Sequence, residues 1–189
     1  VKIHHFQIAI QEYHSRGKEN SFPDIYGCPN PCCNNTGRLR KHGFYSRNVL
    51  TLADSYIIFI QRYYCPVCGK TTSLLPSFLV PRFQYSLICI FYILFQTIYF
   101  RLPFARIAEM VNTSSKRFEM AYQHVCFYRR RLLKNRPVIT GFFGSEGIVL
   151  AEIHSVYWTK DFISKAYHLG LQNFNINYFR FQNRSFMDK

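Results

Sequence analysis

The amino-acid sequence predicts an α+β protein in which a small antiparallel β module precedes a mostly α-helical region. Two cysteine clusters, at 28–33 and 65–68, are the first observation. A β-rich segment, 56–64, runs directly into the second cluster, and residues 85–134 follow a helical pattern. We expect five parts: a leader element at 1–22, the cysteine-containing module at 23–72, a Pro-containing connector at 73–84, a helical domain at 85–136 and a partly disordered extension at 137–189. Within this extension, residues 156–169 are expected to form one more amphipathic helix.

The cysteine spacing is typical of a metal site. Cys65 and Cys68 lie one turn apart, and Gly69 can adopt the left-handed backbone that turns amides toward the sulfurs. In the first cluster Cys28 can pair with Cys32 or Cys33; we favour Cys33, because the run then reads Cys-Pro-x-Pro-x-Cys. Four thiolates at about 2.3 Å complete the shell of one Zn²⁺, the expected cofactor. A disulfide framework and unrelated buried thiols are the alternatives.

The residues between the clusters are expected to form strands. The segment 38–43 predicts a short basic strand that ends at Gly43. The segment 56–64 has Ile, Phe or Tyr at nearly every position, a strong β composition, and it delivers Cys65 to the metal. Two cysteine knuckles joined by a small antiparallel sheet form a zinc ribbon, in which the metal substitutes for a large core.

Two further helices are expected after the apolar helix that ends at Leu102-Pro103. The first shows a buried face at i, i+3, i+4 and i+7 from Phe104 to Val111, and it stops at 112–115. The next is expected to begin near Ser115 and to bury Phe118, Ala121, Tyr122 and Val125. A short helix, a polar turn and a longer helix predict a helix-turn-helix; an ordinary helical hairpin is the alternative.

The formal net charge of +14, from 24 Lys and Arg against 10 Asp and Glu, predicts attraction to polyanions. Double-stranded DNA is the expected partner, with Lys116 and Arg117 near base edges and the other cations near phosphates. The expected contacts are Arg38, Arg40, Lys41, Lys116, Arg117, Arg129, Arg130 and Arg131.

No membrane association is expected. The most apolar stretch, 87–100, is shorter than the roughly 20 residues of a membrane-spanning helix. The first residues lack the charged and then apolar pattern of a signal peptide, so we expect a cytoplasmic protein.

These motifs resemble a known family. Cys28-Pro-x-Pro-x-Cys33, the basic segment with Lys41 and Gly43, Arg62-Tyr-Tyr-Cys65-Pro-x-Cys68-Gly-Lys-Thr and the helix-turn-helix are similar to the amino-terminal half of bacterial insertion-sequence transposases. The segment 70–81 is the most specific match to an uncharacterised transposase-like family, domain of unknown function 6431. The resemblance spans roughly residues 20–135 and implies a ribbon and helix-turn-helix that bind the ends of the element or assist that binding. The Cys32-Cys33 pair departs from the pattern.

No catalytic centre is expected. Transposase chemistry needs three carboxylates that converge on two metal ions. The ten acidic residues are scattered, and only four lie in the carboxy-terminal third. We therefore expect a zinc-dependent DNA-binding protein, an accessory or a regulator, that is not an enzyme. A zinc-stapled protein-interaction module and a truncated fragment of a transposase are the alternatives.

Overall fold

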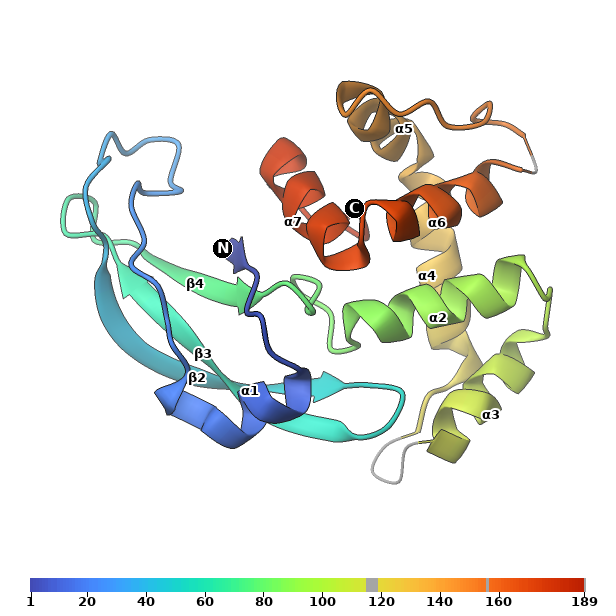
Figure 1. The fold of residues 1–189 in the computed structure, drawn as a ribbon, viewed down its shortest axis with the longest axis horizontal. Coiled ribbons are helices and arrows are strands. Elements are labelled where there is room, and N and C mark those ends of the chain that lie inside the picture. The colour runs from blue at the N-terminus through green and yellow to red at the C-terminus, as the bar shows by residue number, and fades with distance from the viewer. Residues whose placement is uncertain (115–118, 156, 189) are drawn as a thin grey trace.

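The computed structural model describes residues 1–114, 119–155 and 157–188. Within them the chain is α+β, with a four-stranded sheet on one side and helices α2–α7 on the other (Figure 1). The elements are β1 (Lys2–His4), α1 (Ile10–Arg16), a 3₁₀ turn η1 (Gly17–Glu19), β2 (Arg40–Leu50), β3 (Ser55–Tyr64), β4 (Thr71–Pro76), α2 (Leu87–Ile98), α3 (Phe104–Ser114), α4 (Tyr122–Lys134), α5 (Arg136–Ser145), α6 (Trp158–His168) and α7 (Leu171–Gln182).

The sheet has the order β1-β4-β3-β2, so β2 is an edge strand. β2 and β3 form a long antiparallel hairpin, and β3 continues antiparallel into β4. The prediction that the basic strand ends at Gly43 is wrong, because β2 continues to Leu50. Gly43 has a positive φ of 88°, and the register shifts between Lys41 and Phe44, so this glycine makes a β-bulge instead of a stop. The Gln61 Nε2 donates to the Gly43 carbonyl at 2.9 Å and satisfies an acceptor at the bulge.

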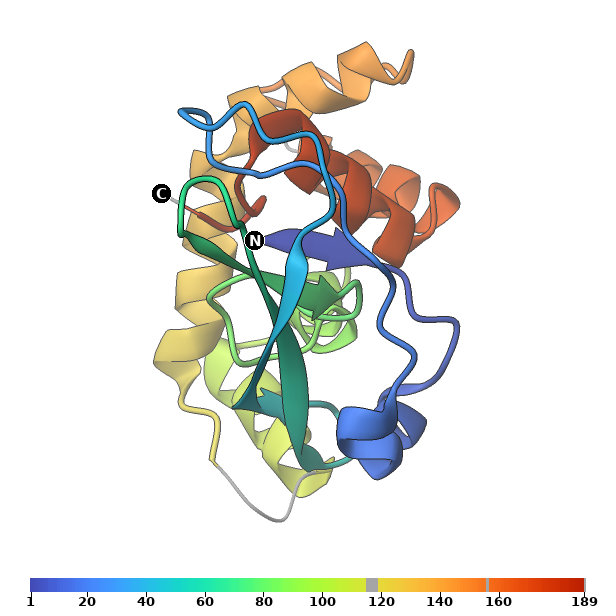
Figure 2. The same ribbon diagram turned by 90° about the vertical axis from the view of Figure 1, so that its left-hand side faces the viewer.

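The first 22 residues are part of the sheet module. β1 pairs in parallel with β4, with Lys2 opposite Leu74. α1 packs beside the sheet, as Figure 2 shows from the sheet side. Its Tyr13 is buried and donates a hydrogen bond from Oη to the Phe59 carbonyl at 3.0 Å. A core of apolar side chains under the sheet therefore includes residues from the leader, β2, β3 and β4.

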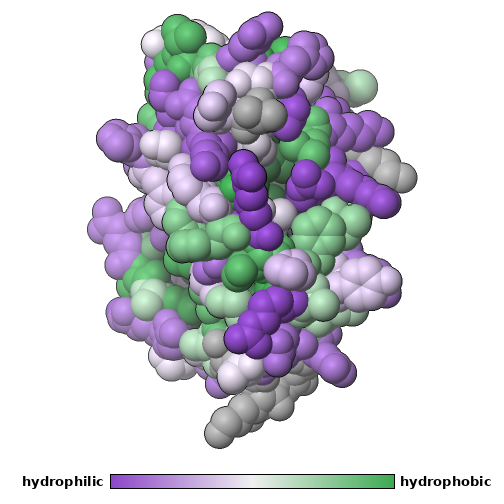
Figure 3. Space-filling model, turned by 90° about the vertical axis from the view of Figure 1, so that its right-hand side faces the viewer, coloured by the Kyte–Doolittle hydropathy of each residue, from purple (hydrophilic) through white to green (hydrophobic). Residues whose placement is uncertain are grey.

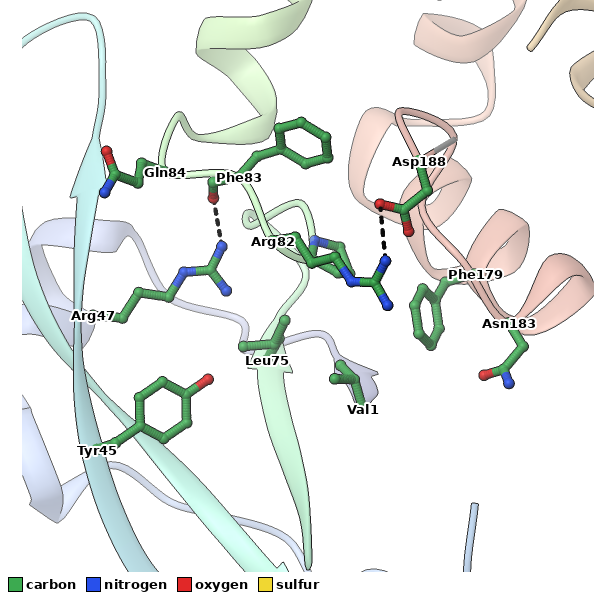
Figure 4. Close-up of a pocket in the computed structure, with 11 residues that line it drawn as sticks. Val1, Tyr45, Arg47, Leu75, Arg82, Phe83, Gln84, Phe179, Asn183 and Asp188 are labelled. Carbon is green, nitrogen blue, oxygen red and sulfur yellow. Dashed lines mark hydrogen bonds and ion pairs between the residues drawn. The ribbon is translucent and has the colours of Figure 1, made fainter. Parts of the chain in front are cut away.

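The connector joins the sheet to the helices through specific hydrogen bonds. β4 extends into it as far as Pro76, and Arg47 on β2 donates to the carbonyls of Val80 and Phe83. This arginine lines a cavity of about 540 Å³ between β2 and the end of α7. Figure 4 shows Arg47 on the sheet side and Phe179 on the α7 side, with Arg82 directed at Asp188 3.8 Å away.

The predicted apolar helix is α2, and it lies at the centre of the helical part (Figure 1). Its N-cap is Ser86, whose Oγ accepts a hydrogen bond from the Cys89 amide. α2 contacts α3, α4, α6 and α7, which explains its nearly continuous apolar sequence. None of the helices in the described ranges has the length and apolar character needed to span a membrane.

The second helix of the predicted helix-turn-helix begins later than expected. α4 starts at Tyr122, and residues 119–121 are not helical, so the expected start near Ser115 is wrong. The reason lies in Asn112, whose side-chain amide donates to the Met120 carbonyl and accepts from the Met120 amide, at 3.1 and 2.6 Å. This pair of bonds holds the chain against α3. Val125 is buried as expected, but Ala121 and Tyr122 are exposed, and Phe118 lies outside the described residues.

The carboxy-terminal part contains the helix expected at 156–169, which is α6, and two further helices where partial disorder was expected. α5, α6 and α7 occupy most of residues 136–182. Their order comes from aromatic side chains that are fully or almost fully buried in the core that α2 also shares: Phe142, Phe143, Trp158, Phe162, Phe174 and Tyr178. Trp158 also donates a hydrogen bond from Nε1 to the Thr140 hydroxyl at 2.9 Å. Burial of these large aromatic side chains stabilises the three helices, although polar residues lie between the aromatic positions.

Candidate metal centre

The first cysteine cluster lies in a loop that backbone hydrogen bonds close at its base. Leu39 donates to the Ile25 carbonyl at 2.8 Å, and Cys28 donates to the Asn35 carbonyl at 2.8 Å. Within the loop, the Cys33 amide donates to the Asn30 carbonyl at 2.9 Å. This tight turn directs Cys28 and Cys33 to the same side, whereas Cys32 is exposed.

The second cluster is the turn between β3 and β4. The Cys65 amide donates to the Lys70 carbonyl at 2.9 Å, and the Gly69 amide donates to the Cys65 carbonyl at 3.0 Å. Gly69 has a φ of 71°, the left-handed conformation that the sequence predicted for this position. β3 thus delivers Cys65, and the turn returns Cys68 to the same point.

The two clusters meet at one place. The sulfurs of Cys28 and Cys68 lie 3.6 Å apart, and those of Cys33 and Cys65 lie 3.8 Å apart. All four sulfurs lie within 4.8 Å of one another. Cys28, Cys33, Cys65 and Cys68 are therefore positioned to hold a metal ion, and they are the four cysteines that the sequence favoured.

Asn35 supports the cluster and was missed at the level of sequence. Its Nδ2 donates to the Cys65 sulfur at 3.2 Å, and its Oδ1 accepts from the Gly37 amide at 2.9 Å. The only signal in the sequence is a polar residue two positions after Cys33, which is common in any turn. Such outer-shell donors orient metal ligands and tune their charge.

The surroundings of the thiols lower the pKa of some and raise the pKa of others. Burial raises the pKa of Cys65, but the amides of Cys68 and Val67 and the Asn35 side chain outweigh it and lower the pKa to about 6. The pKa of Cys68 is also lowered, first by the Lys70 amide. The Asn35 amide lowers the pKa of Cys33, yet burial and the neighbouring thiols raise it overall, to about 12. Four thiolates at this separation repel one another, so a bound cation is needed for all four to ionise.

Comparison with known protein families gave one finding. Residues 28–106 match the domain of unknown function DUF6431. The DUF6431 match begins at Cys28 and ends in α3, so it contains all four cysteines of the cluster, the hairpin β2–β3, and α2. Comparisons with curated proteins and with solved structures found no match.

The predicted DNA contacts are in two separate places. On the edge strand β2, Arg40 and Lys41 are exposed, while Arg38 just before it pairs with Asp24 at 2.7 Å. On α4, Arg129 and Arg130 are exposed, and the Arg131 guanidinium lies over the Phe127 ring, 4.8 Å from its centroid. Lys116 and Arg117 lie outside the described residues.

Proposed function

We propose that the four cysteines bind one Zn²⁺. The observation that carries this assignment is the sulfur spacing. Ligands at about 2.3 Å around a tetrahedral ion lie about 3.8 Å from one another. The closest sulfur pairs, at 3.6 and 3.8 Å, are near that value. A set of four thiolates favours zinc or iron over magnesium and calcium. Elemental analysis of the purified chain distinguishes zinc from iron, and we expect one zinc ion per chain.

We further propose that the zinc-stabilised hairpin β2–β3 and helix α4 bind double-stranded DNA. The chain carries 24 Lys and Arg against 10 Asp and Glu, and several acidic residues are already engaged with Arg or Lys. Among the described residues, Arg40, Lys41, Arg129 and Arg130 take part in no ion pair. A two-stranded β-ribbon fits the major groove of B-form DNA, and exposed cations bind its phosphates.

A competing explanation exists for the β2 charges. Edge strands often carry Lys or Arg because a charge prevents pairing with another chain's strand. That explanation predicts self-association, and no change in DNA affinity, when these residues are neutralised. The DNA proposal predicts weaker DNA binding, and no self-association, when these residues are neutralised.

The test is a titration of random-sequence duplex at several salt concentrations. Each lost phosphate contact lowers the slope of log K against log salt by about 0.9. We therefore expect Arg40→Gln/Lys41→Gln to lower the slope by about 2, and the triple α4 variant at Arg129, Arg130 and Arg131 by about 2 to 3. Arg106→Gln is the matched control, because Arg106 is exposed but pairs with Glu109 at 2.7 Å. An unchanged slope in both test variants favours a zinc-stapled protein-interaction module instead.

We propose that the chain binds DNA without cutting it, as an accessory or regulator related to transposases or as a fragment of one. The described carboxylates support this, since several are engaged one by one: Glu109 with Arg106, Asp161 with Lys165. Supercoiled plasmid incubated with the protein and Mg²⁺ is expected to be retarded on a gel but not nicked. Nicking that copurifies with the protein contradicts the proposal.

A further inference from the structure

A second concentration of positive charge lies in a cavity among the helices, away from the cysteine cluster. This cavity has a volume of about 450 Å³. Among the described residues, four cationic side chains line it: Arg101, Arg129, Arg136 and Lys160. No acidic side chain from the described ranges is among its lining residues. Of these four residues, the sequence predicted only Arg129, as a contact to DNA. The other three come from separate loops and helices, so their proximity is not evident from the sequence.

Arg136 and Arg129 both line this cavity, and the charge of one acts on the other. Burial lowers the pKa of Arg136, and the positive charge of Arg129 lowers it further. The Arg136 Nε is a buried donor with no hydrogen-bond partner in the described part of the chain. A buried donor without a partner costs free energy. An anion in the cavity offsets the mutual repulsion of Arg129 and Arg136.

The surrounding structure holds the cations in place. The Arg136 guanidinium lies over the Trp158 ring, 5.3 Å from its centroid, and an Nη donates to the Ile153 carbonyl at 3.4 Å. Lys160 Nζ lies over the Tyr99 ring at 5.4 Å, and the Tyr99 hydroxyl donates to the Lys160 carbonyl at 3.0 Å. Arg101 has a positive φ of 52°, a conformation that is uncommon for a residue with a side chain. Figure 3, which faces the side where α2 ends and α6 begins, shows hydrophilic side chains interspersed with apolar areas on this face.

We propose that this cavity binds a phosphate group. Guanidinium groups bind phosphate oxygens through paired, charge-assisted hydrogen bonds, and three of the four cations are arginines. The volume lies within the roughly 300–1,000 Å³ range of small-molecule sites. The phosphate can belong to the DNA backbone or to a small phosphorylated compound, and the chemistry of recognition is the same for both.

The test is a calorimetric titration of the zinc-loaded full chain with pyrophosphate at low salt. We expect one pyrophosphate per chain, and affinity weakened about tenfold or more in Arg129→Gln/Lys160→Gln, because two charge-assisted contacts are lost. Lys134→Gln is the matched control: it removes an exposed cation from the same helix α4 but outside the cavity, and we expect less than about a twofold change. The double variant keeps Arg136 on Trp158, and its thermal unfolding shows whether the fold is intact.

A competition experiment with a short DNA duplex identifies the source of the phosphate. If a short duplex displaces pyrophosphate, the cavity takes a backbone phosphate; if duplex and pyrophosphate bind together, it takes a small phosphorylated ligand. Absence of one-to-one binding in the wild type, or equal affinity in the double variant and the wild type, overturns the proposal. The pyrophosphate titration needs no DNA, so its outcome is separate from that of the DNA-binding proposal.

Discussion

At the scale of single residues, Cys32 and Cys33 show how a turn selects one thiol from two. The Cys33 amide donates to the Asn30 carbonyl, and this bond places the Cys33 sulfur 3.8 Å from that of Cys65. Cys32, one position earlier, is exposed and lies outside the cluster. Adjacent cysteines of equal chemistry therefore differ only in the direction that the backbone gives them.

The first prediction separates these two thiols. Cys33→Ser is expected to lose the metal, because a hydroxyl is a poor ligand for the thiolate position and leaves the shell open. Cys32→Ser is expected to retain one metal per chain. Metal content is measured after gel filtration in a mild chelator. If Cys32→Ser alone loses the metal, the assignment of the first knuckle is wrong.

The second prediction concerns Asn35. Asn35→Asp keeps an oxygen for the Gly37 amide but removes the Nδ2 donor and sets a negative charge beside the Cys65 sulfur. We expect metal affinity to fall about 10–100-fold, as for other outer-shell changes. Asn34→Asp, at the exposed neighbouring position, is the control and is expected to change affinity little. Competition with a chromophoric chelator measures both; equal affinities in the two variants contradict the role given to Asn35.

At the scale of elements, the hairpin β2–β3 depends on the bulge at Gly43. Nothing lies within 4 Å of a Cβ built on this glycine, so the cost of any side chain there comes from its positive φ alone. Gly141, inside helix α5, has equally open surroundings but lacks a positive φ. The two glycines have the same space around them but opposite backbone requirements.

The third prediction uses this pair. Gly43→Ala is expected to lower the free energy of unfolding by about 1–2 kcal/mol, because the left-handed conformation is unfavourable for a residue with a Cβ. Gly141→Ala is expected to raise it by about 0.5–1 kcal/mol, because alanine loses less backbone entropy in a helix. Urea denaturation of the metal-loaded protein measures both. Effects of the same sign in the two variants contradict the explanation.

The sequence predicted correctly those features that depend on residues close together in the chain. The cysteine spacing, the β-rich segment before Cys65 and the apolar face from Phe104 to Val111 each correspond to a described element. The features that were missed depend on contacts between residues far apart in the chain. Gly43 is consistent with either a strand end or a bulge until Gln61 lies opposite Phe44 and its side chain bonds to the Gly43 carbonyl. Asn35 donates to a sulfur only because the fold brings Cys65 next to it.

Of the carboxy-terminal helices, α5 and α7 were missed for the same reason. Asn175 and its polar neighbours reduce the apparent periodicity of α7, and the aromatic partners of Phe174 come from α2, α5 and α6. Tertiary packing decides the structure of such a segment, and one sequence does not show which distant rings will pack together.

At the scale of the whole molecule, two apolar cores are joined through the connector. One core lies under the sheet and the other among the helices. Asn175 on α7 is buried, and its Nδ2 donates to the carbonyls of Ser77 and Leu79 at 2.9 and 2.8 Å. The Ser77 hydroxyl also bonds to Gln172 on the same helix. The last helix therefore holds the segment that leaves the sheet.

The fourth prediction is that Asn175 couples the two cores. Asn175→Ala leaves two buried carbonyls without this donor, at an expected cost of about 1–3 kcal/mol. Fluorescence of Trp158, the single tryptophan, reports on the helices, and the charge-transfer band of Co²⁺ at the cysteines reports on the sheet. We expect coincident urea transitions in the wild type and separated ones in the variant. Asn173→Ala, exposed on the same helix, is the control, and transitions that stay coincident in Asn175→Ala contradict the coupling.

The parallel pairing of β1 with β4 also sets an order of events during synthesis. Lys2 lies opposite Leu74, so β1 has no strand to pair with until the ribosome has released β4. All four cysteines leave the ribosome before β4 does, because Cys68 precedes Thr71. On the proposal that the cysteines bind a metal, a nascent chain can bind it while β1 is still unpaired, and the metal-bound hairpin then serves as the template on which β1 closes the sheet.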